Sequence, residues 1–126
     1  MAIITIPEGS RVEVISYGNA ETFLGDAGLN NLADDASTST ITYTAPSGSS
    51  YAKIIILLGK VNVTSTGSIS LEDGVDTYEL EVATGNVFRR VEFNNIPVSF
   101  IDSFSIKNNL GVALAAGGNS VTIIPL

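Results

Sequence analysis

Hydrophobic and polar residues alternate along most of this chain, and the alternation is the main guide to its fold. In the segment 75–82, Tyr78, Leu80 and Val82 fall on one face of an extended strand. Glu79 and Glu81 fall on the other face, which is the pattern of a half-buried strand. Similar patterns predict further strands at 2–6, 11–16, 39–44, 60–65, 68–72, 87–93, 98–102, 104–108, 111–115 and 121–126.

The densest apolar run, residues 54–58, contains three isoleucines and two leucines and ends at Gly59. An uninterrupted aliphatic run of this length is typical of a central strand that is covered on both faces. A strand whose second face meets another subunit is the alternative. A buried helix would also be apolar throughout, but β-branched residues and the shortness of the run favour a strand.

Turn-forming sequences rich in Gly, Asn, Asp, Ser and Pro separate the predicted strands at short intervals. Many short strands joined by such turns indicate an all-β protein. We therefore predict a single domain over residues 1–126 that forms one antiparallel β-sandwich, of jelly-roll or Ig-like type. At this length one hydrophobic core is expected.

The segment 20–37 departs from the strand pattern, because apolar residues recur in it at helical spacing. Gly25, Gly28 and two adjacent asparagines weaken any helix there. We predict one long loop or a short helix near residues 20–37. Long structured loops are often contact elements, so its apolar side chains are candidate partner contacts. The alternative is that they cap an open end of the sandwich; the residues are Phe23, Leu24, Leu29 and Leu32.

Charge and composition narrow the possible partners. The net charge is −7, and 44% of residues are hydrophobic, with a mean hydropathy of +0.33. The basic residues are scattered apart from one pair, so no nucleic acid and no anionic membrane is expected as a partner. The first ten residues lack the basic start of a signal peptide, and no apolar run is long enough to cross a bilayer. We expect a soluble protein made in the cytoplasm.

The chain contains no histidine and no cysteine, which excludes Ser-His-Asp and Cys-His catalysis and thiolate metal sites. Glu79 and Glu81 lie roughly 7 Å apart if they share a strand face, but we expect them to be solvated. Acidic loops around Asp34 and around Asp73 match no calcium-binding pattern, and a hairpin turn at Asp73 and Gly74 explains the second. We therefore predict no enzyme activity and no catalytic, cofactor-binding or metal-binding residues.

Arg89 and Arg90 form the single basic pair, and on a strand they point to opposite faces. One of them should face inward or into an interface, where it needs a carboxylate partner. Glu92, Glu79 or a neighbouring subunit could supply it. Both arginines are candidate partner contacts, and the alternative is that they are charges that protect a sheet edge.

Two stretches carry a resemblance to a known group of proteins. Residues 42–74, "TYTAPSGSSYAKIIILLGKVNVTSTGSISLEDG", place an aliphatic strand and polar hairpins after a strand that ends in a Pro- and Gly-containing turn. Residues 104–126, "FSIKNNLGVALAAGGNSVTIIPL", place a Gly-rich turn before the last strand. This order resembles small β-sandwich virion proteins of tailed bacteriophages. Leu114, Ala116, Gly117 and Val121 match their closing pattern, whereas Asn119 replaces the usual acidic residue.

The resemblance implies a structural role in a virion, with no catalytic residues to carry over. We expect a capsid decoration protein that stabilises the shell, with the major capsid protein or another virion protein as its partner. Such proteins are often symmetric assemblies, so a homo-oligomer, with a trimer as the first guess, is expected. The alternative is a tail-tip or fibre module that binds a host receptor or carbohydrate, using Tyr17 and Tyr51.

Overall fold

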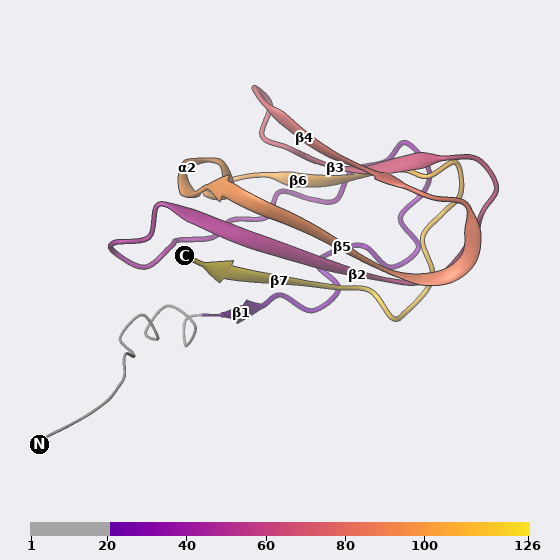
Figure 1. The fold of residues 1–126 in the computed structure, drawn as a ribbon, viewed down its shortest axis with the longest axis horizontal. Helices are drawn as coiled ribbons and strands as arrows, with labels where there is room; N and C mark the ends of the chain where they lie inside the picture. The colour runs from indigo at the N-terminus through magenta and orange to yellow at the C-terminus, as the bar shows by residue number, and fades with distance from the viewer. Residues whose placement is uncertain (1–20) are drawn as a thin grey trace, which may run out of the picture.

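The computed structural model describes residues 21–126, which form two antiparallel sheets packed face to face (Figure 1). The four-stranded sheet has the order β1-β7-β2-β5 and the three-stranded sheet the order β4-β3-β6. The predicted all-β sandwich is therefore confirmed. The elements of the described residues are β1 (Thr22–Phe23), β2 (Tyr51–Val63), β3 (Gly67–Glu72), β4 (Thr77–Val82), β5 (Gly85–Pro97), α2 (Val98–Ile101), β6 (Ser105–Asn109) and β7 (Ser120–Pro125).

The aliphatic run forms the middle of β2, a central strand that pairs with β7 on one side and β5 on the other. Ile54, Ile56 and Leu58 point into the core and are buried. Ile55 is half-buried and Leu57 is 43% exposed. The run is thus a central strand, as predicted, but no other part of residues 21–126 covers its second face.

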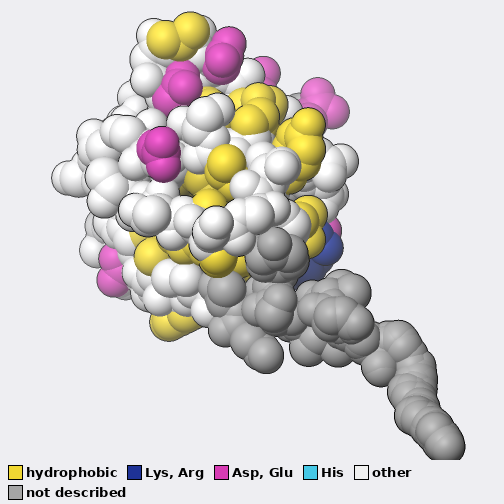
Figure 2. Space-filling model, turned by 90° about the vertical axis from the view of Figure 1, so that its left-hand side faces the viewer, with side chains coloured by type: hydrophobic (Ala, Val, Ile, Leu, Met, Phe, Trp, Pro, Cys, Tyr) yellow, Lys and Arg dark blue, Asp and Glu magenta, His cyan; other side chains and the backbone are white. Residues whose placement is uncertain are grey.

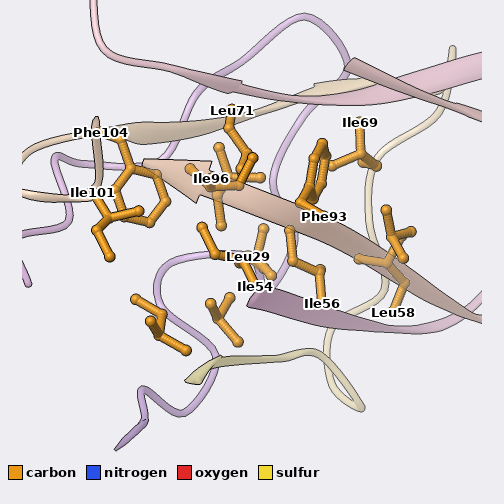
Figure 3. Close-up of a cluster of buried hydrophobic side chains, with 14 of the residues drawn as sticks. Leu29, Ile54, Ile56, Leu58, Ile69, Leu71, Phe93, Ile96, Ile101 and Phe104 are labelled. Atoms are coloured by element: carbon orange, nitrogen blue, oxygen red, sulfur yellow. The ribbon is translucent and has the colours of Figure 1, made fainter. Parts of the chain in front are cut away.

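The core lies between the two sheets (Figure 3). Isoleucines of β2 meet Ile69 and Leu71 of β3 and Ile106 of β6, all of them fully buried. At one end, Phe100 stacks edge-on against Tyr78, with their ring centroids 4.8 Å apart. Aromatic and aliphatic packing of this kind supplies most of the stabilisation of a sandwich.

Two predicted strands are absent from the described residues, and each has a physical reason. Residues 98–102 contain the helical turn α2, which lets the consecutive residues Phe100 and Ile101 both face the core. A strand would have pointed them to opposite faces. Residues 111–115 are irregular, beginning at Gly111 with φ 82°. The strands predicted at 2–6 and 11–16 lie outside the described residues.

The predicted strand at 39–44 is reduced to single bridges along the edge of β6. Ser37 bridges to Lys107 and Ile41 bridges to Phe104. The N–H of Ile106 donates to the Thr38 hydroxyl at 3.1 Å, and the N–H of Thr38 donates back to the carbonyl of Ile106. This edge of the three-stranded sheet is therefore covered by a loop.

The segment 20–37 is a long loop from residue 24 onward and contains no helix in its described part. Positive φ angles at Gly25, Ala27, Gly28, Asn31 and Asp35 turn the chain every few residues, whereas an α-helix needs negative φ throughout. The loop is one of the two alternatives that the sequence left open.

Candidate docking face

The outer side of the four-stranded sheet carries most of the large exposed hydrophobic side chains of the described residues. Phe23 of β1 is 69% exposed, Tyr51 of β2 is 49% exposed and Phe88 of β5 is 71% exposed. Strand register places them on one face together with Leu57 and half-buried Ile55 and Ile124. We call these six residues, Phe23, Tyr51, Ile55, Leu57, Phe88 and Ile124, the apolar face.

Three charged side chains lie on the same side of the sheet as the apolar face, and Lys53 lies within it between Tyr51 and Ile55. Lys53 Nζ lies 3.1 Å from Glu92 Oε2, and Arg90 Nη1 donates to Glu92 Oε1. The hydrogen bond from Lys53, followed by that from Arg90, lowers the pKa of Glu92 below its usual value. Glu92 therefore stays ionised when neighbouring free carboxylates begin to be protonated, and the two cations stay paired with it.

The outer side of the three-stranded sheet is polar. Ser68 and Ser70 of β3 occupy its middle, and Glu79, Glu81 and Asn109 flank them. The Ser68 hydroxyl donates to Glu79 Oε2 at 2.6 Å. Ser68, Glu79, Glu81 and Asn109 line a shallow trough of about 450 Å³.

The two outer sides thus differ in character. The apolar face is accompanied by the cations Lys53 and Arg90 and one anion, Glu92. The opposite side carries three glutamates, Glu72, Glu79 and Glu81, and the cation Lys107. An exposed apolar surface bordered by polar groups is typical of a protein contact site, whereas the acidic side is suited to water.

The end of the sandwich seen in Figure 2 also shows hydrophobic side chains at the surface between the sheets. Acidic side chains are dispersed around them. At this end Leu126, 49% exposed, follows β7, and its N–H donates to the carbonyl of Tyr51 at 2.9 Å. The apolar surface therefore reaches from the sheet to this end through β2 and the C-terminal residue.

The candidate contact residues of the loop 20–37 lie in different environments. Phe23 belongs to the apolar face. Leu29 is 0% exposed and belongs to the core, and Leu24 and Leu32 pack against it. Leu29 is therefore not accessible to a partner in this fold. The three leucines cover part of the core, which agrees with the alternative that they cap the sandwich.

Arg89 and Arg90 point to opposite faces, as predicted. Arg90 pairs with the carboxylate of Glu92, one of the partners that the sequence suggested. Arg89 instead donates to backbone carbonyls, which are those of Val61, Ala83, Gly85 and Val87 at 2.6–3.3 Å. The expectation of a carboxylate for the inward arginine was wrong, because the turn between β4 and β5 turns several carbonyls towards one point.

Replacing Arg89 with leucine should lower the free energy of unfolding by about 2 kcal/mol, because the partly buried hydrogen bonds to the carbonyls of Val61 and Gly85 lose their charged donor. Replacing Arg90 with leucine should cost less than about 1 kcal/mol, since its ion pair is exposed. Urea unfolding of the two variants measures the difference. Equal losses in both would contradict the role assigned to Arg89.

The acidic loops form turns in the structure. In the β3–β4 hairpin Asp73 Oδ1 accepts from the N–H groups of Val75 and Asp76, and Gly74 has φ 93°. The hydrogen bond from Asp76, and then that from Val75, lowers the pKa of Asp73. Asp34 Oδ1 accepts from the N–H of Gly111. Within residues 21–126, no three acidic side chains converge in a way that could hold a metal ion.

Several members of the apolar face were missed from the sequence, although the signal was present. Alternation in 87–93 assigns Val87, Val91 and Phe93 to the core side and so leaves Phe88 on the outer side. The same rule applied to the run 54–58 leaves Ile55 and Leu57 outside. The joining of these positions with Phe23 depends on strand order, which local patterns do not give.

No family model matches the chain, and no match is found among curated proteins or solved structures. No helix within residues 21–126 has the length and hydrophobicity that a membrane span requires.

Proposed function

We propose that this chain is a non-enzymatic structural protein of a virion, a capsid decoration protein that binds the outside of the shell. The observation that carries the proposal is the apolar face. Exposed aromatic and aliphatic side chains gathered on one side of a charged molecule mark a surface that gains stability by being covered. The partner would be the major capsid protein or another virion protein.

The charge difference between the two sides supports one orientation. Burial of the apolar face would bring Lys53 and Arg90 into the contact, where they could meet acidic groups of the shell. The side with Glu72, Glu79 and Glu81 would then face water. The opposite orientation would bury the acidic side against the shell. It would remove three carboxylates from water with only one cation, Lys107, to compensate them, which is unfavourable.

The placement of the acidic groups supports the non-enzymatic part of the proposal. Glu79 and Glu81 are exposed, and Glu79 already accepts a hydrogen bond from Ser68. General acid–base chemistry with carboxylates needs an acid whose environment raises its pKa. Hydrogen bonds lower the pKa of Asp73 and of Glu92, which is the opposite of what a general acid requires.

Particles of the phage that carries this gene should contain the chain in many copies, as measured by quantitative mass spectrometry. The variant Leu57→Glu should reduce the bound copies at least about tenfold, because it places a charge in the middle of the apolar face. The matched control is Thr66→Glu, an exposed position on the acidic side. Absence of the chain from purified particles would overturn the proposal. Equal binding of both variants would show that the apolar face is not the surface that binds the shell.

A second candidate is a tail-tip or fibre module that binds a host receptor or carbohydrate. The trough lined by Ser68, Glu79, Glu81 and Asn109 offers the hydroxyl, carboxylate and amide groups that bind sugars. Exposed Tyr51 offers a stacking surface; Tyr17 lies outside the described residues. A glycan array without hits, and host attachment that survives Tyr51→Ala and Glu81→Ala, would remove this candidate.

A further inference from the structure

β5 forms an edge of the four-stranded sheet within residues 21–126. Its residues Arg89–Phe93 pair in regular register with Ile54–Leu58 of β2, and register shifts interrupt the pairing on both sides. A groove of about 360 Å³ runs beside this regular part, between β5 and β4. Its apolar lining includes Leu80, Val82 and Val91. The edge is therefore regular over Arg89–Phe93 and accessible to an extended strand.

The side chains of this edge have a self-complementary order. Arg90 and Glu92 both lie on the outer side of the sheet, two residues apart, with buried Val91 between them on the core side. If two copies of β5 run antiparallel with Val91 at the centre, residue 90 of each copy faces residue 92 of the other. Opposite charges would then face each other at both positions.

We propose that β5 pairs antiparallel with β5 of a second copy of this chain, with a two-fold axis at Val91. The four-stranded sheets of the two copies would join into one continuous sheet. Arg90 would then face Glu92 of the partner subunit, and Glu92 would face the partner subunit's Arg90. The pairing is independent of the proposed role in a virion, because it concerns the sheet edge and not the apolar face.

The structure favours a second copy over an unrelated strand for two reasons. When β5 faces a second, antiparallel copy of itself, Arg90 and Glu92 each meet the opposite charge. An unrelated strand would offer this order of charges only by chance. In addition, pairing extends the apolar side of one sheet into that of its neighbour, since β5 of each copy carries Phe88 on that side. Identical antiparallel edges close with two copies, so this contact predicts a dimer and not the trimer expected above.

The charges set the register of the pair more than its strength. Arg90 already pairs with Glu92 of its own chain, and Lys53 holds Glu92 from β2 at 3.1 Å. On pairing, Arg90 exchanges one carboxylate for another, so the net gain from charge is small. Backbone hydrogen bonds and the covered groove supply the attraction, and a shifted register would oppose like charges.

Analytical ultracentrifugation of the full chain tests the proposal. The wild-type protein should sediment with twice the chain mass of 13.1 kDa. Arg90→Glu alone and Glu92→Arg alone each place two pairs of like charges in the contact, and we expect each to weaken the dimer about thirtyfold. Lys107→Glu, on the outer side of the other sheet, should leave the dimer unchanged.

A mixture of the two charge variants separates contacts between copies from contacts within one chain. The glutamate introduced at position 90 of one variant faces the arginine introduced at position 92 of the other. The mixture should therefore recover dimers that neither variant forms alone. Each variant still lacks its own internal pair, so recovery shows a contact between copies that brings this part of β5 together, and the cross-link at position 91 tests its register. A wild-type monomer, a wild-type trimer or a mixture that fails to recover would each overturn the proposal.

A cross-link provides a second measurement that depends little on the stability of the charge variants. The chain has no cysteine, so Val91→Cys introduces a single thiol at the proposed two-fold axis. Under mild oxidation we expect a disulfide between the thiols introduced into two copies, with Thr66→Cys as the exposed control that forms none efficiently. A cross-link from the thiol at position 91 to a different protein in particles, or equal yields for both variants, would contradict pairing through β5.

Discussion

Replacing Asn108 with aspartate is expected to lower the free energy of unfolding by about 4 kcal/mol at neutral pH. Asn108 is 0% exposed. Its Nδ2 donates to the carbonyls of Leu32 and Val112 at 3.0 and 2.8 Å, and its Oδ1 accepts from the N–H of Leu110. A carboxylate in this place would turn an acceptor towards two acceptors. Chemical denaturation of the variant at pH 7 measures the loss.

The loss should depend on pH in a defined direction. Burial and the two facing carbonyls would raise the pKa of the introduced carboxyl in the folded state above the ordinary aspartate value of about 3.9. The destabilisation should therefore be smallest below that value, where the carboxyl is protonated in both states. It should grow as the pH rises from there towards the raised pKa and level off above it.

Asn109→Asp is the matched control for this prediction. The neighbouring Asn109 is partly exposed, and its Nδ2 donates to the Ser70 hydroxyl at 2.9 Å. A hydroxyl can also donate, so Ser70 can satisfy a carboxylate at this position. We expect a cost below about 1 kcal/mol. Similar losses for the two variants, or a loss for Asn108→Asp that does not change with pH, would contradict the role given to Asn108.

Replacing Gly59 with alanine should lower the free energy of unfolding by about 3 kcal/mol or more. A Cβ at this position would overlap the carbonyl oxygen of Gly117 and lie 2.7 Å from the Cβ of Ala115. The loop cannot simply withdraw, because the N–H of Gly59 donates to Asn119 Oδ1 at 2.9 Å. Thermal and urea unfolding measure the effect.

Gly117→Ala is the control on the other side of the same contact. A Cβ on Gly117 would have no atom within 4 Å, and Gly117 has no positive φ. The stability of this variant should remain within about 1 kcal/mol of the wild type. If Gly59→Ala is as stable as Gly117→Ala, the close approach of β2 to the loop before β7 is wrong.

The strands were predictable from the sequence wherever one face is buried. Tyr78, Leu80 and Val82 alternate with glutamates, and the structure places them on β4 with their side chains towards the interior. The run 54–58 was also assigned correctly to a central strand. Period-two patterns succeed in these cases because burial of one face fixes the register of a strand.

The buried amides were not predictable, because their partners are distant in the sequence. Asn108 ends a predicted strand, and Asn119 lies in the Gly-rich turn before the last strand. In the structure each ties together backbone segments that are far apart, and Asn119 bonds to Gly59, sixty residues away. Local patterns contain no information on such pairs, because these depend on how the sheets stack. The strand order that brings the residues of the apolar face together could not be predicted from the sequence for the same reason.

The loop that covers β6 has a consequence for how these molecules can polymerise. Bridges at Ser37 and Ile41 occupy one edge of the smaller sheet, and β1, at one edge of the larger sheet, is two residues long. Open strand edges are the usual starting points of fibrils. Once two copies have joined through β5, the remaining open edge of the described residues is β4, and its exposed Glu79 and Glu81 disfavour pairing with a further copy. A crowded solution of this protein should then collect closed pairs instead of filaments.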